Sequence, residues 1–194
     1  MKENKTGKHL LAVLGSPHTA GSTAAMLDYT LDLARKDGWS VTVIHLYHKQ
    51  IAYCTGCRSC VKTGQCVIQD DIQEIASHLK NCNRVILAAP TYWANVPAIV
   101  KNMFDRLMGT AMEETAAFPQ PRLSSCQDYL LLTACNTPFP FSRVCGQSNG
   151  TLRAMNEFFR TSGMKRLGQV VFTNAKGTGK LPAGIQKKIG RVWK

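Results

Sequence analysis

Residues 9–23 read HLLAVLGSPHTAGST, and this stretch decides the fold. Its first six residues form a short apolar run, which is typical of a strand buried in a parallel sheet. A loop of small and hydroxyl-bearing residues follows at once, and residues 23–36 then place apolar side chains at helical spacing. A strand that leads through such a loop directly into a helix is the opening half of a βαβ unit.

The same alternation of strand and helix continues along the chain. Further apolar runs predict strands at residues 40–44, 84–89, 129–134 and 169–172. Apolar residues at helical spacing predict helices at residues 72–79, 97–107, 152–161 and 182–193. Strands that alternate with helices form right-handed βαβ units, so we predict an α/β fold with a doubly wound parallel sheet. No linker interrupts the pattern, and we expect a single domain over residues 1–194.

The composition is that of a soluble globular protein. The chain has 194 residues, of which 44% are apolar and 19% are charged. The sequence contains no apolar run of the roughly 20 residues that a membrane helix needs. The apolar stretch at residues 10–14 is too short for the core of a signal peptide. We therefore expect a cytoplasmic protein that is not bound to a membrane.

The charge is strongly basic and uneven. The formal net charge is +12, and residues 142–194 hold 11 Lys or Arg residues against one acid, Glu157. A basic surface attracts anions. No helix-turn-helix, zinc-finger spacing or RNA-binding aromatic motif accompanies the charge, so we expect no nucleic-acid partner. A phosphorylated ligand or an acidic protein fits the charge, and a solvated basic face without a specific partner is the alternative.

Four of the eight cysteines are clustered. They have the spacing Cys-x2-Cys-x2-Cys-x5-Cys, at Cys54, Cys57, Cys60 and Cys66. Disulfides are uncommon in the reducing cytoplasm, so clustered cysteines there indicate a metal or redox role. Thiolates at such short intervals can surround one small inorganic centre. Four free thiols are the main alternative, and a zinc site is a weaker one because zinc usually takes two separated pairs of cysteines.

Two loops carry the pattern of a ligand site. In doubly wound sheets, ligands bind beyond the carboxyl ends of the strands. The loop at 15–23 leads into a helix N-terminus, where backbone N–H groups favour a phosphate and Ser16, Ser22 and Thr23 add hydroxyl groups. This loop matches neither the Walker A pattern nor the Rossmann fingerprint. Residues 177–180, GTGK, also match neither pattern. A simple capped turn is the alternative.

The second loop, residues 90–97, reads PTYWANVP and follows a buried strand. Tyr92 and Trp93 offer aromatic surface for a flat ring. Asn95 and the backbone N–H groups offer hydrogen-bond donors for its polar edge.

Together these loops resemble a known family. The pattern Gly15-Ser16-Pro17…Gly21-Ser22-Thr23 resembles the phosphate loop of the NAD(P)H-dependent FMN reductase family, within the flavodoxin-like group. Residues 90–97 with Lys101 and residues 104–106 resemble the second flavin segment of that family. There are two departures: His18 stands where an arginine is usual, and residues 133–136 lack a glycine pair that many members carry.

The resemblance implies a fold, a cofactor and a set of site residues. The fold is a flavodoxin-like α/β/α sandwich with a five-stranded parallel sheet of order 2-1-3-4-5. The cofactor is FMN, with NAD(P)H as the substrate that reduces it. The implied FMN contacts are Ser16, His18, Ser22, Thr23, Ala24, Pro90, Thr91, Tyr92, Trp93, Asn95 and Val96. Neither the residues nor the resemblance identifies a catalytic acid or base.

The resemblance also implies an activity and leaves a rival. We expect an FMN-dependent oxidoreductase that passes electrons from NAD(P)H to a small acceptor. The cysteine spacing resembles the iron–sulfur flavoprotein branch, in which a [4Fe–4S] cluster on Cys54, Cys57, Cys60 and Cys66 would accept electrons from an acidic ferredoxin. A binding protein without redox turnover is a third hypothesis. The family implies a homodimer or a dimer of dimers, and we expect the long loops at 108–127 and 136–149 to close over the flavin or to form a dimer contact.

Overall fold

The structure, a computed structural model, describes residues 7–177 and 179–194. Five parallel strands form one sheet in the order β2-β1-β3-β6-β7. Their bounds are β1 His9–Leu14, β2 Ser40–His45, β3 Arg84–Pro90, β6 Asp128–Cys135 and β7 Lys165–Thr173. Counted along the chain within this sheet, the order is 2-1-3-4-5, so the predicted α/β fold and strand order are confirmed.

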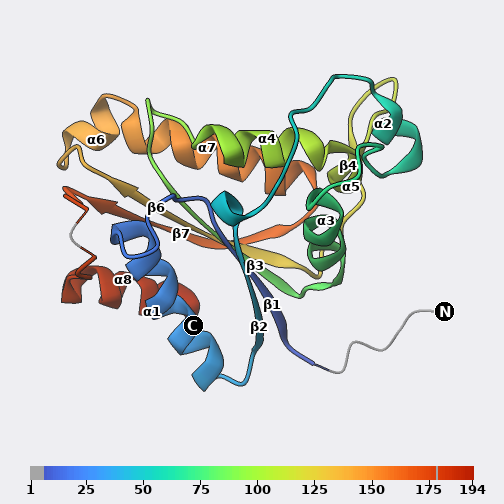
Figure 1. Ribbon diagram of the computed structural model, residues 1–194. Helices are drawn as coiled ribbons and strands as arrows, with labels where there is room; N and C mark the ends of the chain where they lie inside the picture. The colour runs from blue at the N-terminus through green and yellow to red at the C-terminus, as the bar shows by residue number, and fades with distance from the viewer. Residues whose placement is uncertain (1–6, 178) are drawn as a thin grey trace.

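Helices cover both faces of the sheet, as Figure 1 shows. The helices of one face are α1 (Ser22–Lys36) and α8 (Ala183–Trp193). Those of the other face are α3 (Ile72–Asn81), α4 (Ala98–Arg106) and α7 (Gln147–Thr161). Side chains alternate along a strand, and β1 accordingly sends Leu11 and Val13 into the core under α3, α4 and α7. Its other apolar side chains enter the core under α1 and α8.

Several short elements lie outside the strands and helices that we predicted. They are η1 (Leu46–His48), α2 (Ser59–Thr63), α5 (Met108–Ala111), β4 (Met112–Glu113), β5 (Gln120–Pro121) and α6 (Phe141–Val144). Helix α7 begins five residues before its predicted start at 152, because Gly146 takes a left-handed φ of 71° at the N-cap position. Its first turn, Gln147 to Gly150, has no apolar side chain that periodicity could detect.

Strand register brings four loops to one edge of the sheet. Leu14 lies beside Ala88, Pro90 lies beside Ala134, and Cys135 lies beside Thr173. The segments that begin at 15, 91, 136 and 174 therefore leave the sheet at the same edge, next to the N-terminus of α1. Within the described residues, no helix is both long and apolar enough to cross a membrane.

Candidate functional site

The loop after β1 is held close to the sheet. Gly15 N–H donates a hydrogen bond of 2.8 Å to the carbonyl of Ala88. A Cβ atom on Gly15 would lie 2.3 Å from Cγ2 of Val100, so any larger residue here would have to displace the Val100 side chain. The next residue makes a tight local turn, in which Ser16 Oγ accepts the N–H of His18 at 3.2 Å. The loop thus keeps the N-terminus of α1 near the ends of β1 and β3.

The first turn of α1 is open to a ligand. Gly21 is the N-cap residue and has no side chain that could cap the helix, and the first turn contains no acidic residue. The N–H groups and the positive end of the helix dipole therefore remain available for an anion. The Thr23 side chain is buried here. Ser22 Oγ instead donates to the carbonyl of Ala175 at 2.7 Å, so its proton is engaged within the protein.

Residues 92–95 form a strained aromatic turn. The N–H of Tyr92 donates to the carbonyl of Asn95, and the N–H of Asn95 donates to the carbonyl of Tyr92, both at 2.9 Å. The two central residues, Trp93 and Ala94, have positive φ values of 52° and 57°. Such values in residues other than glycine persist only where the surroundings enforce them. The turn leaves the Trp93 side chain 98% exposed and Tyr92 41% exposed.

Helix α7 holds this turn in place. A Cβ atom on Gly150 would lie 1.9 Å from the carbonyl oxygen of Ala94, so only a glycine lets the helix approach so closely. The fully buried Thr151 hydroxyl lies 3.0 Å from the carbonyl oxygen of Asn95 and 3.0 Å from the hydroxyl of Thr91. The turn that presents the aromatic side chains is therefore positioned by a helix that begins more than fifty residues later.

These segments enclose one pocket of about 550 Å³, a volume in the range of cofactor sites. Seven of the predicted contacts line it: Ser16, His18, Ser22, Thr23, Pro90, Thr91 and Tyr92. Four others do not. Ala24 and Val96 are buried in the core, and Trp93 points its side chain to solvent. Asn95 turns its side-chain oxygen to the N–H of Val96 at 2.8 Å.

The third wall of the pocket combines a loop that we expected at the site with a segment that we did not expect there. This wall consists of Ala134, Cys135, Asn136, Thr137, Gln147, Ala175, Lys176 and Gly177. The loop after β6 belongs to the residues 136–149 that we expected to close over the flavin or to form a dimer contact, whereas the segment after β7 was not predicted. The available signal for that segment was the rule that ligands sit beyond the carboxyl ends of parallel strands, applied to β7 as well. Of the two long loops, 136–149 supplies lining residues to this pocket, whereas the described lining includes none from 108–127.

The residues present fit a ligand with a phosphate and a flat ring. At one end of the pocket are the open first turn of α1, the hydroxyls of Ser16 and Thr23, and the side chains of His18 and Lys176. At the other end are Pro90, Thr91 and Tyr92. Among the described residues that line the pocket there is no carboxylate, so the charge of its wall suits an anion.

The four clustered cysteines line a second, smaller hollow of about 40 Å³. Cys54 and Cys57 are exposed, Cys60 is buried on α2, and Cys66 is half-buried. Hydrogen bonds from the backbone N–H and the hydroxyl of Ser59 lower the pKa of the Cys57 thiol. Within the described part of the chain, no three His, Cys, Asp or Glu side chains are arranged to hold a metal ion. The four thiols therefore share a hollow without forming a ready ligand set.

Two polar side chains of α4 hold the cysteine loop, the segment that carries Cys54, Cys57, Cys60 and Cys66. Asn102 Nδ2 donates to the carbonyls of Ile51 and Ala52, both at 3.2 Å, and its Oδ1 accepts the N–H of Cys54 at 3.3 Å. Arg106 has a completely buried side chain and donates to the carbonyl of Ala52 at 2.5 Å. Because α4 starts directly after residues 90–97, one helix connects the aromatic turn to the cysteine loop.

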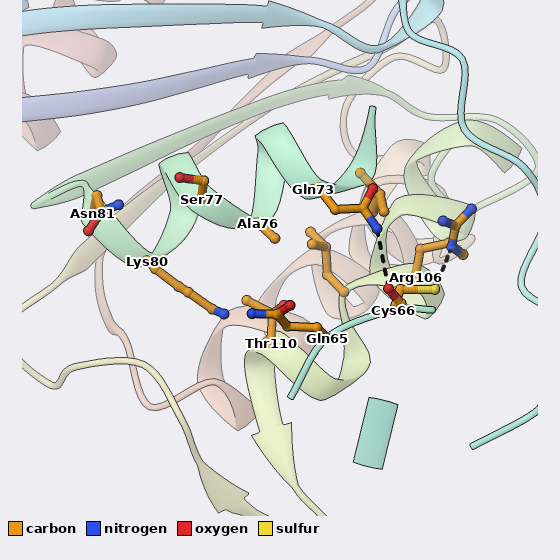
Figure 2. Close-up of a pocket in the computed structure, with 11 residues that line it drawn as sticks. Gln65, Cys66, Gln73, Ala76, Ser77, Lys80, Asn81, Arg106 and Thr110 are labelled. Atoms are coloured by element: carbon orange, nitrogen blue, oxygen red, sulfur yellow. Dashed lines mark hydrogen bonds between the residues drawn. The ribbon is translucent and has the colours of Figure 1, made fainter. Parts of the chain in front are cut away.

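Arg106 also fixes the far end of that loop. It donates to both carboxylate oxygens of Asp70, at 2.8 and 3.0 Å, and its Nε lies 3.1 Å from Sγ of Cys66. Figure 2 shows Arg106 and Gln73 on either side of Cys66, beside a cavity of about 280 Å³ that opens along α3. Cys66 lines both this cavity and the cysteine hollow.

The fold and the larger pocket define the class of the protein: a flavodoxin-like α/β protein with an open helix N-terminus beside an aromatic turn. The family model described as NADPH-dependent FMN reductase matches residues 9–120. Since this is more than half of the chain, the chain belongs to the NADPH-dependent FMN reductase family.

Curated relatives come from archaea and are named iron–sulfur flavoproteins. One from Archaeoglobus fulgidus is 39% identical over 98 residues, which cover 50% of this chain and 44% of that protein. One from Methanocaldococcus jannaschii is 32% identical over 97 residues, which cover 50% of each. The chain thus spans about half the length of the curated relatives that it matches.

Solved structures of low sequence identity share the fold. An FMN-dependent NADH-azoreductase from Bacillus anthracis, solved with FMN, superposes with a TM-score of 0.72 at 13% identity and covers 97% of this chain and 96% of its own. An NAD(P)H:quinone oxidoreductase from Methanothermobacter marburgensis gives a TM-score of 0.71 at 13% identity, with 97% and 94% covered. At this identity the likeness establishes the fold alone.

Proposed function

We propose that this chain binds FMN in the 550 Å³ pocket and acts as an oxidoreductase that passes electrons from NAD(P)H to a small acceptor. One observation carries the proposal. In a chain of the FMN reductase family, the open N-terminus of α1 and the aromatic turn at residues 92–95 border the same pocket.

The residues around the pocket would divide the work of binding. The first turn of α1, with the hydroxyls of Ser16 and Thr23, would hold the phosphate. Tyr92 and the wall at residues 134–137 would hold the ring system. When bound, FMN accepts a hydride from a nicotinamide and delivers the electrons to an acceptor. The exposed indole of Trp93 offers apolar surface beside the pocket for the nicotinamide or the acceptor.

FMN titration and turnover test this proposal. Apo-protein reconstituted with FMN should oxidise NADH or NADPH in the presence of a benzoquinone, and comparing the two nucleotides shows the preference. Thr23→Ala should weaken FMN binding by about 10-fold or more, the effect of losing one charge-assisted hydrogen bond. Thr19→Ala is the matched control, because Thr19 is exposed in the same loop. Wild-type protein that retains no FMN after reconstitution would refute the proposal.

The cysteine hollow supports a second candidate, an iron–sulfur flavoprotein electron carrier. All four clustered cysteines line one hollow, and Arg106 holds the chain on both sides of them. Cysteine thiolates are the ligands of iron–sulfur clusters, and a loop of this kind can close around a centre that organises it. In this candidate a [4Fe–4S] cluster takes electrons from an acidic redox protein such as a ferredoxin.

Cofactor analysis of anaerobically purified protein separates the two candidates. About four irons and four sulfides per chain, with FMN, would favour the electron carrier. Cys60→Ser should then lose most of the iron, whereas Cys126→Ser should keep it, because Cys126 lies outside the hollow. FMN without iron, together with NAD(P)H oxidation, would leave the reductase as the function.

We also propose the setting in which the protein works. A cytoplasmic location is supported by the eight cysteines, all of which are free thiols in the structure. A homodimer or a dimer of dimers would cover exposed apolar side chains close to the pocket, among them Trp93, Phe139 and Phe141. Light scattering at several protein concentrations tests the assembly. The partner is a small acceptor or an acidic redox protein rather than nucleic acid.

A further inference from the structure

The segment after β7 contacts the loop at residues 15–23 at two points. Ser22 Oγ donates to the carbonyl of Ala175 in a buried hydrogen bond of 2.7 Å. A Cβ atom on Gly179 would lie 2.4 Å from the carbonyl oxygen of Ala20, so the two backbones are in direct contact there. The N–H of Ala175 also donates to the carbonyl of Cys135 at 3.2 Å. The segment is thereby placed at the α1 end of the pocket.

The backbone of this segment is bent sharply around Ala175. Asn174, Lys176 and Gly177 have positive φ values of 54°, 40° and 68°. For lysine such a φ is less favourable than for glycine. Lys176 lines the pocket, together with Ser16, Ser22 and Thr23.

Lys176 is the one lysine among the described residues that line the pocket. His18 is the other described lining residue that can carry a positive charge. Among the described residues, no carboxylate lies within salt-bridge distance of Lys176, and none lines the pocket. A dianionic phosphate bound at the first turn of α1 would meet this ammonium group without a competing anion.

We propose that Lys176, from outside the part of the chain that matches the family, pairs with the phosphate of bound FMN and makes the site selective for the phosphorylated flavin. The inference rests on the proposed FMN site. The family model matches residues 9–120, so this cation lies outside the matched segment.

Parallel titrations with FMN and riboflavin test the inference, because riboflavin lacks the phosphate. Lys176→Met should raise the Kd for FMN by about 10- to 100-fold, the range of one charge-assisted contact, and change the Kd for riboflavin less than about 2-fold. Lys176→Arg keeps the charge and should bind FMN within about 3-fold of wild type. Lys180→Met is the matched control, because Lys180 is exposed on the same segment but does not line the pocket.

The outcomes separate this inference from the proposed function. If wild-type protein binds FMN and Lys176→Met binds it equally well, the role of Lys176 is refuted while the FMN site stands. Equal weakening of FMN and riboflavin, or an equal loss in Lys180→Met, also refutes it, since the effect would then come from the loop or from overall charge. If wild-type protein binds no FMN, both proposals fall.

Discussion

Replacing Gly150 by alanine tests the most specific packing constraint at the site. Alanine in place of glycine within a helix normally stabilises a protein by about 1 kcal/mol. At Gly150 the new Cβ would lie 1.9 Å from the carbonyl oxygen of Ala94, more than 1 Å inside the 3.0 Å below which Cβ contacts essentially do not occur. Either α7 or the aromatic turn must move by about that amount. Overpacking of this kind costs about 1–3 kcal/mol, so we expect a net destabilisation of about 0–2 kcal/mol.

Gly190→Ala provides the control that removes helix propensity from the comparison. Gly190 is also in a helix, α8, and a Cβ there would meet nothing within 4 Å. This variant should be more stable than wild type by about 0.5–1 kcal/mol. The two variants should therefore differ by about 0.5–3 kcal/mol in the free energy of unfolding, measured by urea denaturation.

The flavin affinity supplies a second readout. Movement of the turn stretches the hydrogen bonds from Thr151 that hold it, so Gly150→Ala should weaken FMN binding by about 10-fold, about 1.4 kcal/mol. Gly190→Ala should leave FMN binding unchanged. Equal stabilisation by both alanines, with equal FMN affinity, would show that α7 does not position the turn.

Three further predictions follow from contacts elsewhere in the structure. Arg106→Met should lower the free energy of unfolding by about 3–5 kcal/mol, because it removes the ion-pair partner of the partly buried Asp70 carboxylate. Limited proteolysis should then cut the loop that carries the clustered cysteines faster than in wild type. Burial alone would raise the pKa of Asp70, but hydrogen bonds from Arg106 and from backbone N–H groups outweigh burial and lower this pKa. The ionised carboxyl therefore stabilises the folded state, and this stabilisation is lost as the pH falls below about 4. The urea midpoint of Asp70→Asn should accordingly vary less between pH 5 and pH 3 than that of wild type. Trp193→Ala should lower the free energy of unfolding by about 3 kcal/mol, because it removes a buried indole and its 2.6 Å hydrogen bond to Asp37. It should leave FMN affinity unchanged, since Asp37 lies at the opposite end of α1 from the pocket.

The strands, the helices and one half of the pocket could be predicted from the sequence. Apolar runs and helical periodicity depend on neighbouring residues, and they marked the five strands of the sheet and its main helices. The loops at 15–23 and 90–97 were recognisable because each carries its chemistry within a few consecutive residues. Short or polar elements were missed, such as α2 and the first turn of α7, because they have too few apolar positions to show a period.

The tertiary structure decided which side chains share the pocket. Ser22 and Ala175 are 153 residues apart yet joined by a hydrogen bond, and Gly150 is what admits α7 beside the turn at residues 92–95. A parallel sheet gathers the carboxyl ends of strands that are distant in the chain, so the second half of the site has no local signature. By itself the sequence determined the order of elements and the two motif loops. The packing alone directed Trp93 to solvent and brought Lys176 to the pocket, because both positions depend on contacts between segments far apart in the sequence.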